Sequence, residues 1–389
     1  MEPIEILFWC ALALIAYTYL GYGLILYLMV RIKRVVQKYE KPVNHSYEPR
    51  VTLLIAAYNE KDYVRQKIEN TRRLDYPSDK LEQLWVTDGS DDGTAELLSA
   101  YKDVKVLHQP ERKGKVAAIN RGMKQVDSPI VIFSDANTDL GEKSIRIIVE
   151  KFSDPKTGCV SGEKRIMNHD IDAAAGAGEG FYWRYESKLK KWDAELNSVV
   201  GAAGELFAVR TELFQEVEPD TLLDDFMISL RIAMKGYSIQ YDPEAYALET
   251  ASANVKEELK RKIRIAAGGI QSVIRLFPLL NIFKLGLLSF QYLSHRVLRW
   301  TLTPLALVAV LALNIALYGH SELYRILLWL QGIFYLSALL GWLLENFQLK
   351  IKVLFVPFYF FIMNYAVIRG WLRFLQKNQS VNWDRAKRG

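Results

Sequence analysis

Four uncharged apolar stretches constrain this chain more strongly than any other feature of its sequence. They cover residues 6–30, 301–319, 326–344 and 353–368. A helix needs about 20 apolar residues to cross the hydrocarbon core of a bilayer, so the first three stretches predict membrane-spanning helices. The last stretch is shorter and contains Pro357, so a re-entrant segment that turns at this proline is the alternative. We expect four spans.

Charges near these stretches predict how the chain lies in the membrane. The residues before the first stretch are acidic and no small-residue cleavage site follows it, so a cleaved signal peptide is not expected. Arg31, Lys33 and Arg34 come directly after it, which places the following domain in the cytoplasm by the positive-inside rule. We therefore expect a multi-pass protein of a bacterial-type inner membrane with a cytoplasmic domain.

The C-terminal end conflicts with this arrangement. Three C-terminal spans that start in the cytoplasm would leave the last residues outside, yet these residues are strongly basic. The cations are Arg369, Arg373, Lys377, Arg385, Lys387 and Arg388. Either the fourth stretch is re-entrant or the charge bias is overruled.

Between about residues 49 and 250 the pattern alternates between strand and helix. Short apolar strands are predicted at 51–57, 81–87, 104–109 and 130–134, with helices from Lys61, from Thr94 and over 115–126. This rhythm indicates an α/β fold, with an open, mostly parallel, Rossmann-like sheet and helices on both faces. In such sheets, ligands bind beyond the carboxyl ends of the strands.

Polar side chains collect at these strand ends. They are Tyr58, Asn59 and Glu60 after the first strand, Asp88 after the second, and Asp135 with Asn137 after the fourth. Carboxylate and amide oxygens are hard ligands that suit Mg²⁺ or Mn²⁺, and such ions usually bridge to substrate phosphates. A strand-end aspartate is also a common first residue of a loop, so Asp135 and Asn137 alone are a weak metal signal.

Further candidate site residues lie at predicted helix starts. Lys115 supplies a cation where phosphate is favoured. Asp224 and Asp225 open an amphipathic helix, and two adjacent carboxylates belong either in a polar cleft or at a helix start that they stabilise through its dipole. Gly201 and Gly204 come shortly before them, which permits either close approach of a ligand or a tight packing turn.

Beyond this region, an aromatic helix is expected from Gly180 and a basic helix over 254–275. The next segment, 276–300, repeats apolar residues at helical spacing and places Gln291 and His295 elsewhere on the helix surface. The apolar set is Phe283, Leu287, Phe290, Leu293 and Val297. This pattern predicts an amphipathic helix in the bilayer interface, with a core helix of the cytoplasmic domain as the alternative.

Taken in order, these motifs resemble the family-2 glycosyltransferases, inverting membrane enzymes that include the hyaluronan, cellulose, chitin and poly-N-acetylglucosamine synthases. The matching positions are Ala57-Tyr58-Asn59-Glu60, Asp88-Gly89-Ser90, Asp92-Gly93-Thr94, Gly114-Lys115 with Asn120, Ser134-Asp135-Ala136-Asn137, Gly204 and Asp224-Asp225. The resemblance covers about residues 50–270 and implies a GT-A catalytic domain flanked by transmembrane helices.

The resemblance also implies how a UDP-sugar donor would bind. Tyr58, Glu60 and Asp88 would hold the uridine. Lys115 would contact the phosphates or the sugar, and Gly204 would lie beside the substrate.

For catalysis, the resemblance implies that Asp225 is the general base and that Asp224 is its neighbour. Asp135 and Asn137 would hold Mg²⁺ or Mn²⁺ on the diphosphate. The acceptor would be a glycan or a lipid-linked sugar.

This chain departs from the family pattern in ways that bear on its product. Thr87 stands where an acidic pair would precede Gly-Ser, and Asn137 replaces the second carboxylate of an Asp-x-Asp motif. Many processive members carry a Gln-x-x-Arg-Trp motif, and residues 261–265 stand in its place. Arg261 replaces the glutamine, and Arg264 keeps the cation that would face the diphosphate. Arg261 stays a candidate substrate contact. Because Ile265 replaces the tryptophan, addition of one or a few sugars stays as open as polymerisation.

The expected organisation is a transmembrane helix at 1–34, a GT-A domain at 35–275, an interface helix at 276–300, transmembrane helices at 301–375 and a basic tail at 376–389. Cys10 and Cys159 alone make no disulfide framework. The net charge of +6 suits membrane lipids and a diphosphate substrate, and no basic block interleaved with aromatics indicates nucleic acid.

Three functions remain open at this point. The first is a polysaccharide-forming transferase that uses a UDP-sugar, and the second is a single-addition transferase with a polyprenyl-linked acceptor. The third is a non-catalytic membrane scaffold that binds nucleotide sugar. A dinucleotide enzyme is disfavoured because no Gly-x-Gly-x-x-Gly turn follows the first strand.

Overall fold

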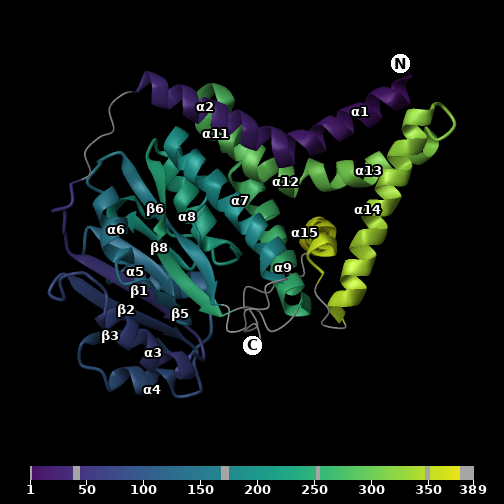
Figure 1. The fold of residues 1–389 in the computed structure, drawn as a ribbon. Coiled ribbons are helices and arrows are strands. Elements are labelled where there is room, and N and C mark those ends of the chain that lie inside the picture. The colour runs from purple at the N-terminus through teal and green to yellow at the C-terminus, as the bar shows by residue number, and fades with distance from the viewer. Residues whose placement is uncertain (1, 38–43, 168–174, 251–254, 347–350, 377–389) are drawn as a thin grey trace.

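In the computed structural model of the protein, the described residues are 2–37, 44–167, 175–250, 255–346 and 351–376. Of residues 175–183, 345–346 and 352, only the backbone is described. A sheet with its covering helices forms one part of the molecule, and long apolar helices form the other (Figure 1).

The sheet has eight strands in the order β3-β2-β1-β4-β7-β6-β8-β5. The strands are β1 (Val51–Ala57), β2 (Leu81–Asp88), β3 (Val104–Gln109), β4 (Ile130–Asp135), β5 (Thr138–Leu140), β6 (Thr157–Met167), β7 (Leu206–Arg210) and β8 (Ser238–Thr250). The predicted parallel half is confirmed, because β1 pairs in parallel with β2 and β4, and β2 with β3. The other half is mixed, since β7 runs antiparallel to both β4 and β6.

Helices cover both faces of this sheet (Figure 1). They are α3 (Lys61–Arg72), α4 (Thr94–Ser99), α5 (Lys115–Met123), α6 (Ser144–Lys151), α7 (Ala175–Leu196), the 3₁₀ turn η2 (Thr211–Leu213) and α8 (Asp224–Met234). The predicted helix starts at Lys61, Thr94 and Lys115 are confirmed, although α5 ends at Met123 rather than at Val126.

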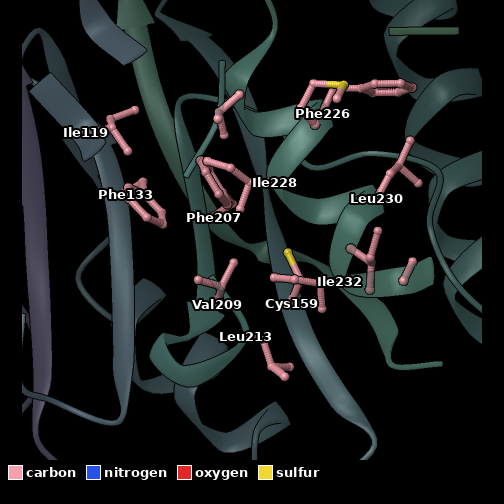
Figure 2. Packing of buried hydrophobic residues seen from close by; sticks show 14 of the residues in the cluster. Ile119, Phe133, Cys159, Phe207, Val209, Leu213, Phe226, Ile228, Leu230 and Ile232 are labelled. Atoms are coloured by element: carbon pink, nitrogen blue, oxygen red, sulfur yellow. The ribbon is translucent and has the colours of Figure 1, made fainter. Parts of the chain in front are cut away.

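Alternating side chains of the central strands supply two separate cores. Leu54 belongs to the core that contains α5 and α8, whereas Leu53 and Ile55 belong to the other, because successive side chains of a strand point to opposite faces. In the first core, Ile228 of α8 lies toward Phe207 of the strands, whereas the Phe226 ring packs against Tyr292 and Trp300 (Figure 2). Each fully buried side chain of this kind stabilises the fold by about 1.5–3 kcal/mol. The packing holds the start of α8 against the sheet edge.

Three helices among the described residues are long and apolar enough to cross a membrane. The first is a continuous helical segment of 34 residues that comprises α1 (Pro3–Ala16), the π-helical turn η1 (Tyr17–Gly21) and α2 (Tyr22–Val36). The others are α14 (Glu322–Asn346) and α15 (Lys352–Leu375). The candidate spans predicted at 6–30 and 326–344 are thus confirmed by length and composition.

The span expected at 301–319 stays a prediction, because its helix reaches span length only together with a neighbouring segment. Its helix, α13 (Leu302–Ala316), has 15 residues. At 1.5 Å per residue this is about 22 Å, short of the roughly 30 Å hydrocarbon core. It reaches span length only together with the segment Leu287–Trp300, from which it is bent by 52°. A fourth span therefore requires that this bent pair crosses as one unit.

The alternative of a re-entrant turn at Pro357 is wrong. Helix α15 runs through Pro357 without a break for 24 residues. A Cβ at Gly341 of α14 would lie 2.7 Å from the Leu354 carbonyl oxygen, and one at Gly370 would lie 2.7 Å from Ala266 of α9 (Val255–Arg275). Close packing on both neighbours thus offsets the local cost of the proline. Of the expected basic tail, 377–389 lies outside the described residues.

The segment predicted as one interface helix is broken into short pieces. They are η3 (Phe277–Leu280), α10 (Ile282–Leu285), α11 (Leu287–Tyr292), the π-helical turn η4 (Leu293–Val297) and α12 (Leu298–Trp300). Gln291 and His295, expected on the surface, are fully buried because both contact Asp193 of α7. Phe283 is fully exposed. The segment is therefore part core and part apolar surface, and its place at the bilayer interface stays a prediction.

Candidate active site

A cavity of about 1090 Å³ lies where the sheet edge meets the long apolar helices. At one end its wall contains most of the predicted site residues, namely Glu60, Lys115, Asp135, Asn137, Gly204, Asp224, Asp225, Arg261 and Arg264. At the other end it is lined from α1, η1 and α15 by Ile15, Tyr19, Leu20, Val356, Phe360 and Asn364. The cavity thus connects the predicted site directly with the candidate membrane-spanning helices.

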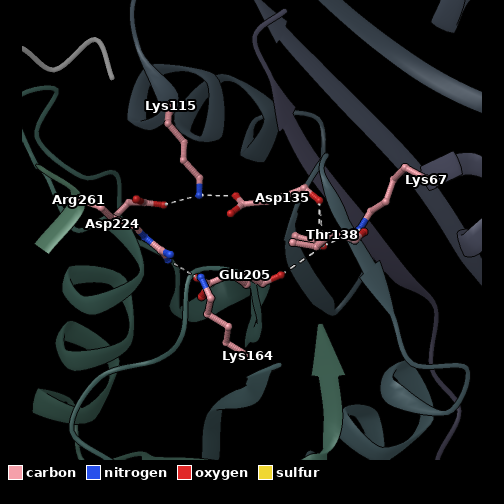
Figure 3. Close-up of polar contacts among 9 residues, drawn as sticks. Lys67, Lys115, Asp135, Thr138, Lys164, Glu205, Asp224 and Arg261 are labelled. Carbon is pink, nitrogen blue, oxygen red and sulfur yellow. Dashed lines mark hydrogen bonds and ion pairs between the residues drawn. The ribbon is translucent and has the colours of Figure 1, made fainter. Parts of the chain in front are cut away.

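Lys115 joins two carboxylates of the site. Its Nζ lies 2.7 Å from Asp135 Oδ1 and 4.0 Å from Asp224 Oδ2 (Figure 3). Asp135 ends β4 and Asp224 begins α8, so one cation links the sheet edge to the start of the helix. Burial opposes the charge on Lys115, but Asp135 and Asp224 raise its pKa above the usual lysine value. The side chain therefore stays protonated.

Asp225 has the properties of a proton acceptor. Burial and the adjacent Asp224 carboxylate raise the pKa of Asp225 to about 7, while Lys115 opposes this shift. A carboxyl group with a pKa near the working pH suits general-base catalysis. Asp224 Oδ2 is buried and has no hydrogen-bond partner among the described residues, so this neighbour keeps its repulsive effect.

The two glycines of Gly201-Ala202-Ala203-Gly204 have different roles. Gly201 has a φ of +99°, and a Cβ there would lie 2.3 Å from the Phe226 ring, so this glycine makes a packing turn. A Cβ at Gly204 would lie 3.0 Å from Asp225 Oδ2. Gly204 therefore leaves room for the carboxyl group of Asp225 at the cavity wall.

Asp88 braces the loop before α5 and does not line the cavity. Its Oδ2 accepts hydrogen bonds from the backbone N–H groups of Lys113 at 2.9 Å and Gly114 at 2.6 Å. These N–H groups, expected to favour phosphate, are thus already occupied. Asp88 Oδ1 is buried, lacks a hydrogen-bond partner in the described part of the chain and lies 3.8 Å from Arg121 Nη1. This oxygen therefore has an ion-pair partner in Arg121 but no hydrogen bond among the described residues.

Tyr58 also lies outside the cavity lining, next to this loop. The Arg112 guanidinium lies over its ring, 3.7 Å from the centroid, in a cation–π contact. Glu60, two residues further on, connects the loop after β1 to α4, because its N–H donates to Thr94 Oγ1 at 3.0 Å. Tyr58 and Arg112 together form an aromatic and cationic corner near Asp88.

Arg261 belongs to a compact group of opposite charges on the cavity wall. Its Nη2 lies 2.8 Å from Glu205 Oε1, and its Nη1 lies 3.6 Å from Glu249 Oε2. Lys164 contacts the same two carboxylates, and Figure 3 shows it beside Glu205 and Arg261. Arg264 lines the cavity, where burial lowers its pKa and Asp224 opposes the change. Arg264 thus faces the reaction end of the cavity, whereas Arg261 is held by protein carboxylates.

The donor set at Asp135 and Asn137 fits a divalent cation only in part. No group of three or more His, Cys, Asp or Glu side chains in the described ranges is arranged to bind a metal. Asp135 shares one oxygen with Lys115. A single carboxylate and an amide oxygen leave most of an octahedral shell open. The site therefore fits Mg²⁺ or Mn²⁺ only together with phosphate oxygens of a bound substrate.

Several residues near the site were not found by sequence reasoning. Lys67, Glu205 and Lys164 belong to no motif, and only the folded chain places them at the site. Arg112 likewise belongs to no motif, and its contact with Tyr58 depends on the loop geometry.

Comparison with known proteins places this geometry in a family. Residues 52–218 match the family described as Glycosyl transferase family 2. The poly-beta-1,6-N-acetyl-D-glucosamine synthase of Staphylococcus epidermidis is 24% identical over 301 residues, which are 73% of this chain and 72% of that protein. The synthase of the same name from Staphylococcus aureus is 29% identical over 237 residues, 58% of this chain and 56% of its own length.

A solved structure extends the likeness to the membrane helices. The mannosyltransferase PcManGT from Pyrobaculum calidifontis, in complex with GDP-Man and Mn²⁺, superimposes with a TM-score of 0.71. The match covers 95% of this chain and 99% of that one at 24% identity, which establishes the fold. The expected GT-A domain with flanking apolar helices is confirmed, and a non-catalytic scaffold is set aside. These matches support a family-2 glycosyltransferase, with the family match confined to residues 52–218.

Proposed function

We propose that the protein transfers a sugar from a UDP-sugar to a growing glycan and inverts the configuration at the anomeric carbon. The observation that carries this proposal is Asp225, whose pKa is raised to about 7 on the wall of a cavity that it shares with Lys115 and Asp135. Similarity to poly-beta-1,6-N-acetyl-D-glucosamine synthases supports a polysaccharide as the product.

In the proposed reaction, Asp225 takes the proton of an acceptor hydroxyl as its oxygen bonds to the anomeric carbon. The bond from that carbon to the diphosphate oxygen breaks, and the diphosphate leaves with the bonding electrons. Attack from the opposite face converts an α-linked donor into a β-linked product. The protonated Lys115 counters the negative charge that develops on the leaving group.

Asp135 and Asn137 would hold Mg²⁺ or Mn²⁺ beside the diphosphate. Such an ion, when bound, supplies positive charge to the phosphate oxygens. The presence of Mn²⁺ in the structurally similar mannosyltransferase supports this assignment.

The nucleotide base would lie at the corner of Tyr58, Arg112 and Asp88. Asp88 has one carboxylate oxygen that accepts two backbone hydrogen bonds and one, beside Arg121, that accepts none among the described residues. A single acceptor matches uracil, which offers one ring N–H, better than guanine, which offers two adjacent donors. This chemistry favours UDP, although the similar mannosyltransferase contains GDP-Man.

The domain that contains this site is proposed to face the cytoplasm of a bacterial cell. The cations Arg31, Lys33 and Arg34 at the end of the first membrane helix support this orientation. We also propose the domain boundaries expected from the sequence, with a catalytic domain at 35–275.

A second function is single addition to a polyprenyl-linked acceptor. The observation in its favour is the membrane end of the cavity, where Leu20 is 73% exposed and Val356 is 50% exposed on apolar helices. A lipid chain has an apolar wall there, next to the site of transfer.

The experiment that tests these proposals measures UDP release by the purified protein in nanodiscs, with Mn²⁺ or Mg²⁺ and a panel of nucleotide sugars. Release with one UDP-sugar, absent from the Asp225→Asn variant, supports the first proposal, and the size of the product shows whether a polymer forms. Release only after addition of polyprenyl phosphate acceptors supports the second. Release with GDP-sugars alone contradicts the assignment of the donor.

A further inference from the structure

Lys67 is a buried lysine that the proposed reaction does not use. It lies in the middle of α3, and its side chain is 1% exposed. No carboxylate in the described residues lies within ion-pair distance of its Nζ, and burial lowers the pKa of Lys67 to about 7. Burying a cation without a counter-ion costs several kcal/mol. An apolar residue would serve better if this side chain only filled space.

The Lys67 ammonium group is directed at one turn of the sheet. Its Nζ donates to Ser134 Oγ at 2.8 Å, to the Thr138 carbonyl oxygen at 2.7 Å and to Thr138 Oγ1 at 3.1 Å (Figure 3). An ammonium group has three donors and no acceptor, so these contacts use its full capacity.

The residues that Lys67 holds stand on either side of Asp135 and Asn137. Ser134 comes directly before Asp135, and Thr138 comes directly after Asn137. Thr138 Oγ1 also donates to the Asp135 carbonyl oxygen at 2.9 Å. Lys67 thus fixes both ends of the turn between β4 and β5 from the side away from the cavity.

A neighbour of Lys67 on α3 holds the same hairpin without touching this turn. Asn70 Nδ2 donates to the Leu140 carbonyl oxygen at 2.8 Å, and Asn70 Oδ1 accepts from the Leu140 N–H at 2.8 Å. Asn70 is buried in the same helix and fixes β5 at its far end. It therefore offers a matched control for Lys67.

We propose that Lys67 is a positioning residue for divalent-cation binding, which acts by fixing the backbone from which Asp135 and Asn137 reach the cavity. This inference rests on the proposed metal role of these two side chains. Groups that orient metal ligands from behind typically contribute 10- to 100-fold in metal affinity. Lys67 would do so through the backbone of the turn, with no contact to substrate.

The test measures Mn²⁺ binding directly, by the loss of the free Mn²⁺ signal in electron paramagnetic resonance, with the full chain in nanodiscs and saturating UDP. Lys67→Met is expected to raise the half-saturating Mn²⁺ concentration about 10- to 100-fold. Asn70→Leu is expected to leave that concentration unchanged, although it removes two hydrogen bonds. Thermal unfolding of both variants records their loss of stability.

Three outcomes would overturn the inference: an unchanged Mn²⁺ affinity in Lys67→Met, a tighter one, or an equal weakening in Lys67→Met and Asn70→Leu. If Lys67→Met does not fold, Ser134→Ala removes one of the acceptors of Lys67 and should weaken Mn²⁺ binding in the same direction. If the parent protein with UDP binds no Mn²⁺, the proposed metal site fails as well. If the parent binds it and the variants match the parent, only the role of Lys67 fails.

Discussion

Two clusters of buried charge in this molecule are built in opposite ways. The reaction cluster consists of Lys115, Asp135, Asp224 and Asp225 at the sheet edge. The junction cluster consists of Glu186, Asp193, His295 and Arg299 between α7 and the short helices before α13. They share a composition of carboxylates and cations but differ in how completely the carboxylates are satisfied.

The reaction cluster has more carboxylates than cations at close range. Lys115 serves both Asp135 and Asp224, and Asp224 Oδ2 lacks a hydrogen-bond partner within the described ranges. Asp225 responds with a raised pKa. Such a cluster can take up a proton or a cationic ligand.

The junction cluster has donors for each of its carboxylates. Asp193 accepts from Tyr22 Oη, from Gln291 Nε2 at 2.9 Å and from His295 Nδ1 at 2.6 Å. Glu186 lies 3.2 Å from His295 Nε2 and also contacts Arg299. Both ring nitrogens of His295 face carboxylates, so both contacts are hydrogen bonds when the ring is protonated.

The electrostatic outcome differs accordingly. Burial alone would raise the pKa of Glu186, but Arg299 and His295 hold it well below the usual range. The pKa of Asp225 is raised and that of Glu186 is lowered, so burial alone does not decide the direction of a pKa shift. The number of nearby donors and cations decides it.

The largest expected effect tests the junction cluster. His295→Leu leaves Asp193 and Glu186 buried without their shared donor, which should destabilise the fold by about 3–5 kcal/mol. Thermal unfolding measures the change, and His45→Leu, at a histidine whose side chain is 78% exposed, is the control and should change little. Normal stability combined with loss of UDP release would contradict this contrast, because the junction cluster would then act in the reaction and not in folding.

The next effect tests the reaction cluster. Asp225→Asn should fold normally but lose at least about a hundredfold in turnover, because the amide cannot accept the proton. The control is Asp220→Asn, which removes an exposed carboxylate 2.6 Å from Arg275 and should keep turnover near the parent value. Near-normal UDP release by the Asp225 variant would remove this residue from the role of base.

The pH dependence sharpens the same contrast. With a pKa of about 7, Asp225 is ionised less as the pH falls, so kcat/KM should drop about tenfold from pH 8 to pH 6. The folded pKa lies above the usual 3.8, so the stability contributed by the protonated carboxyl group is lost as the pH rises through about 7. The residual activity of Asp225→Asn should lack this limb, and an unchanged limb would assign it to another group.

The smallest effect comes from an exposed ion pair outside both clusters. Arg72 and Asp103 lie 2.8 Å apart with both side chains 49% exposed. Asp103→Asn should change the free energy of unfolding by less than about 1 kcal/mol. Urea unfolding measures it, and a loss comparable to that of His295→Leu would contradict the view that burial and partner number decide the energetics.

The sequence predicted the parallel half of the sheet because its strands are continuous apolar runs. The bounds of β1 and β3 match the prediction, and Asp88 and Asp135 fall at strand ends. The three-residue β5 and the antiparallel β7 depend on partners distant in the chain. No local pattern records such pairings.

In the apolar helices, too, the sequence did not reveal features that depend on contacts between distant parts of the chain. Pro357 carries a local cost, but glycines on α14 and on α15 itself allow the close packing that keeps α15 continuous. Gln291 and His295 were expected on a surface because they interrupt an apolar pattern. Their common partner is Asp193, about a hundred residues earlier in the chain. Lys67 likewise gained a role only once β4 and β5 lay beside α3.

The hydrogen bond from Tyr22 to Asp193 bears on whether the predicted catalytic domain can fold on its own. Tyr22 lies in the first membrane helix, and Gln291 and His295 lie beyond the predicted end of the catalytic domain, yet all three fill one site on α7. A shortened chain of residues 35–275 would lack these partners, so the carboxylates of Asp193 and Glu186 would lose hydrogen bonds that they make in the folded chain. The first apolar helix and the segment after residue 275 thus complete the packing around α7, so the described sheet region and these helices share one buried polar site.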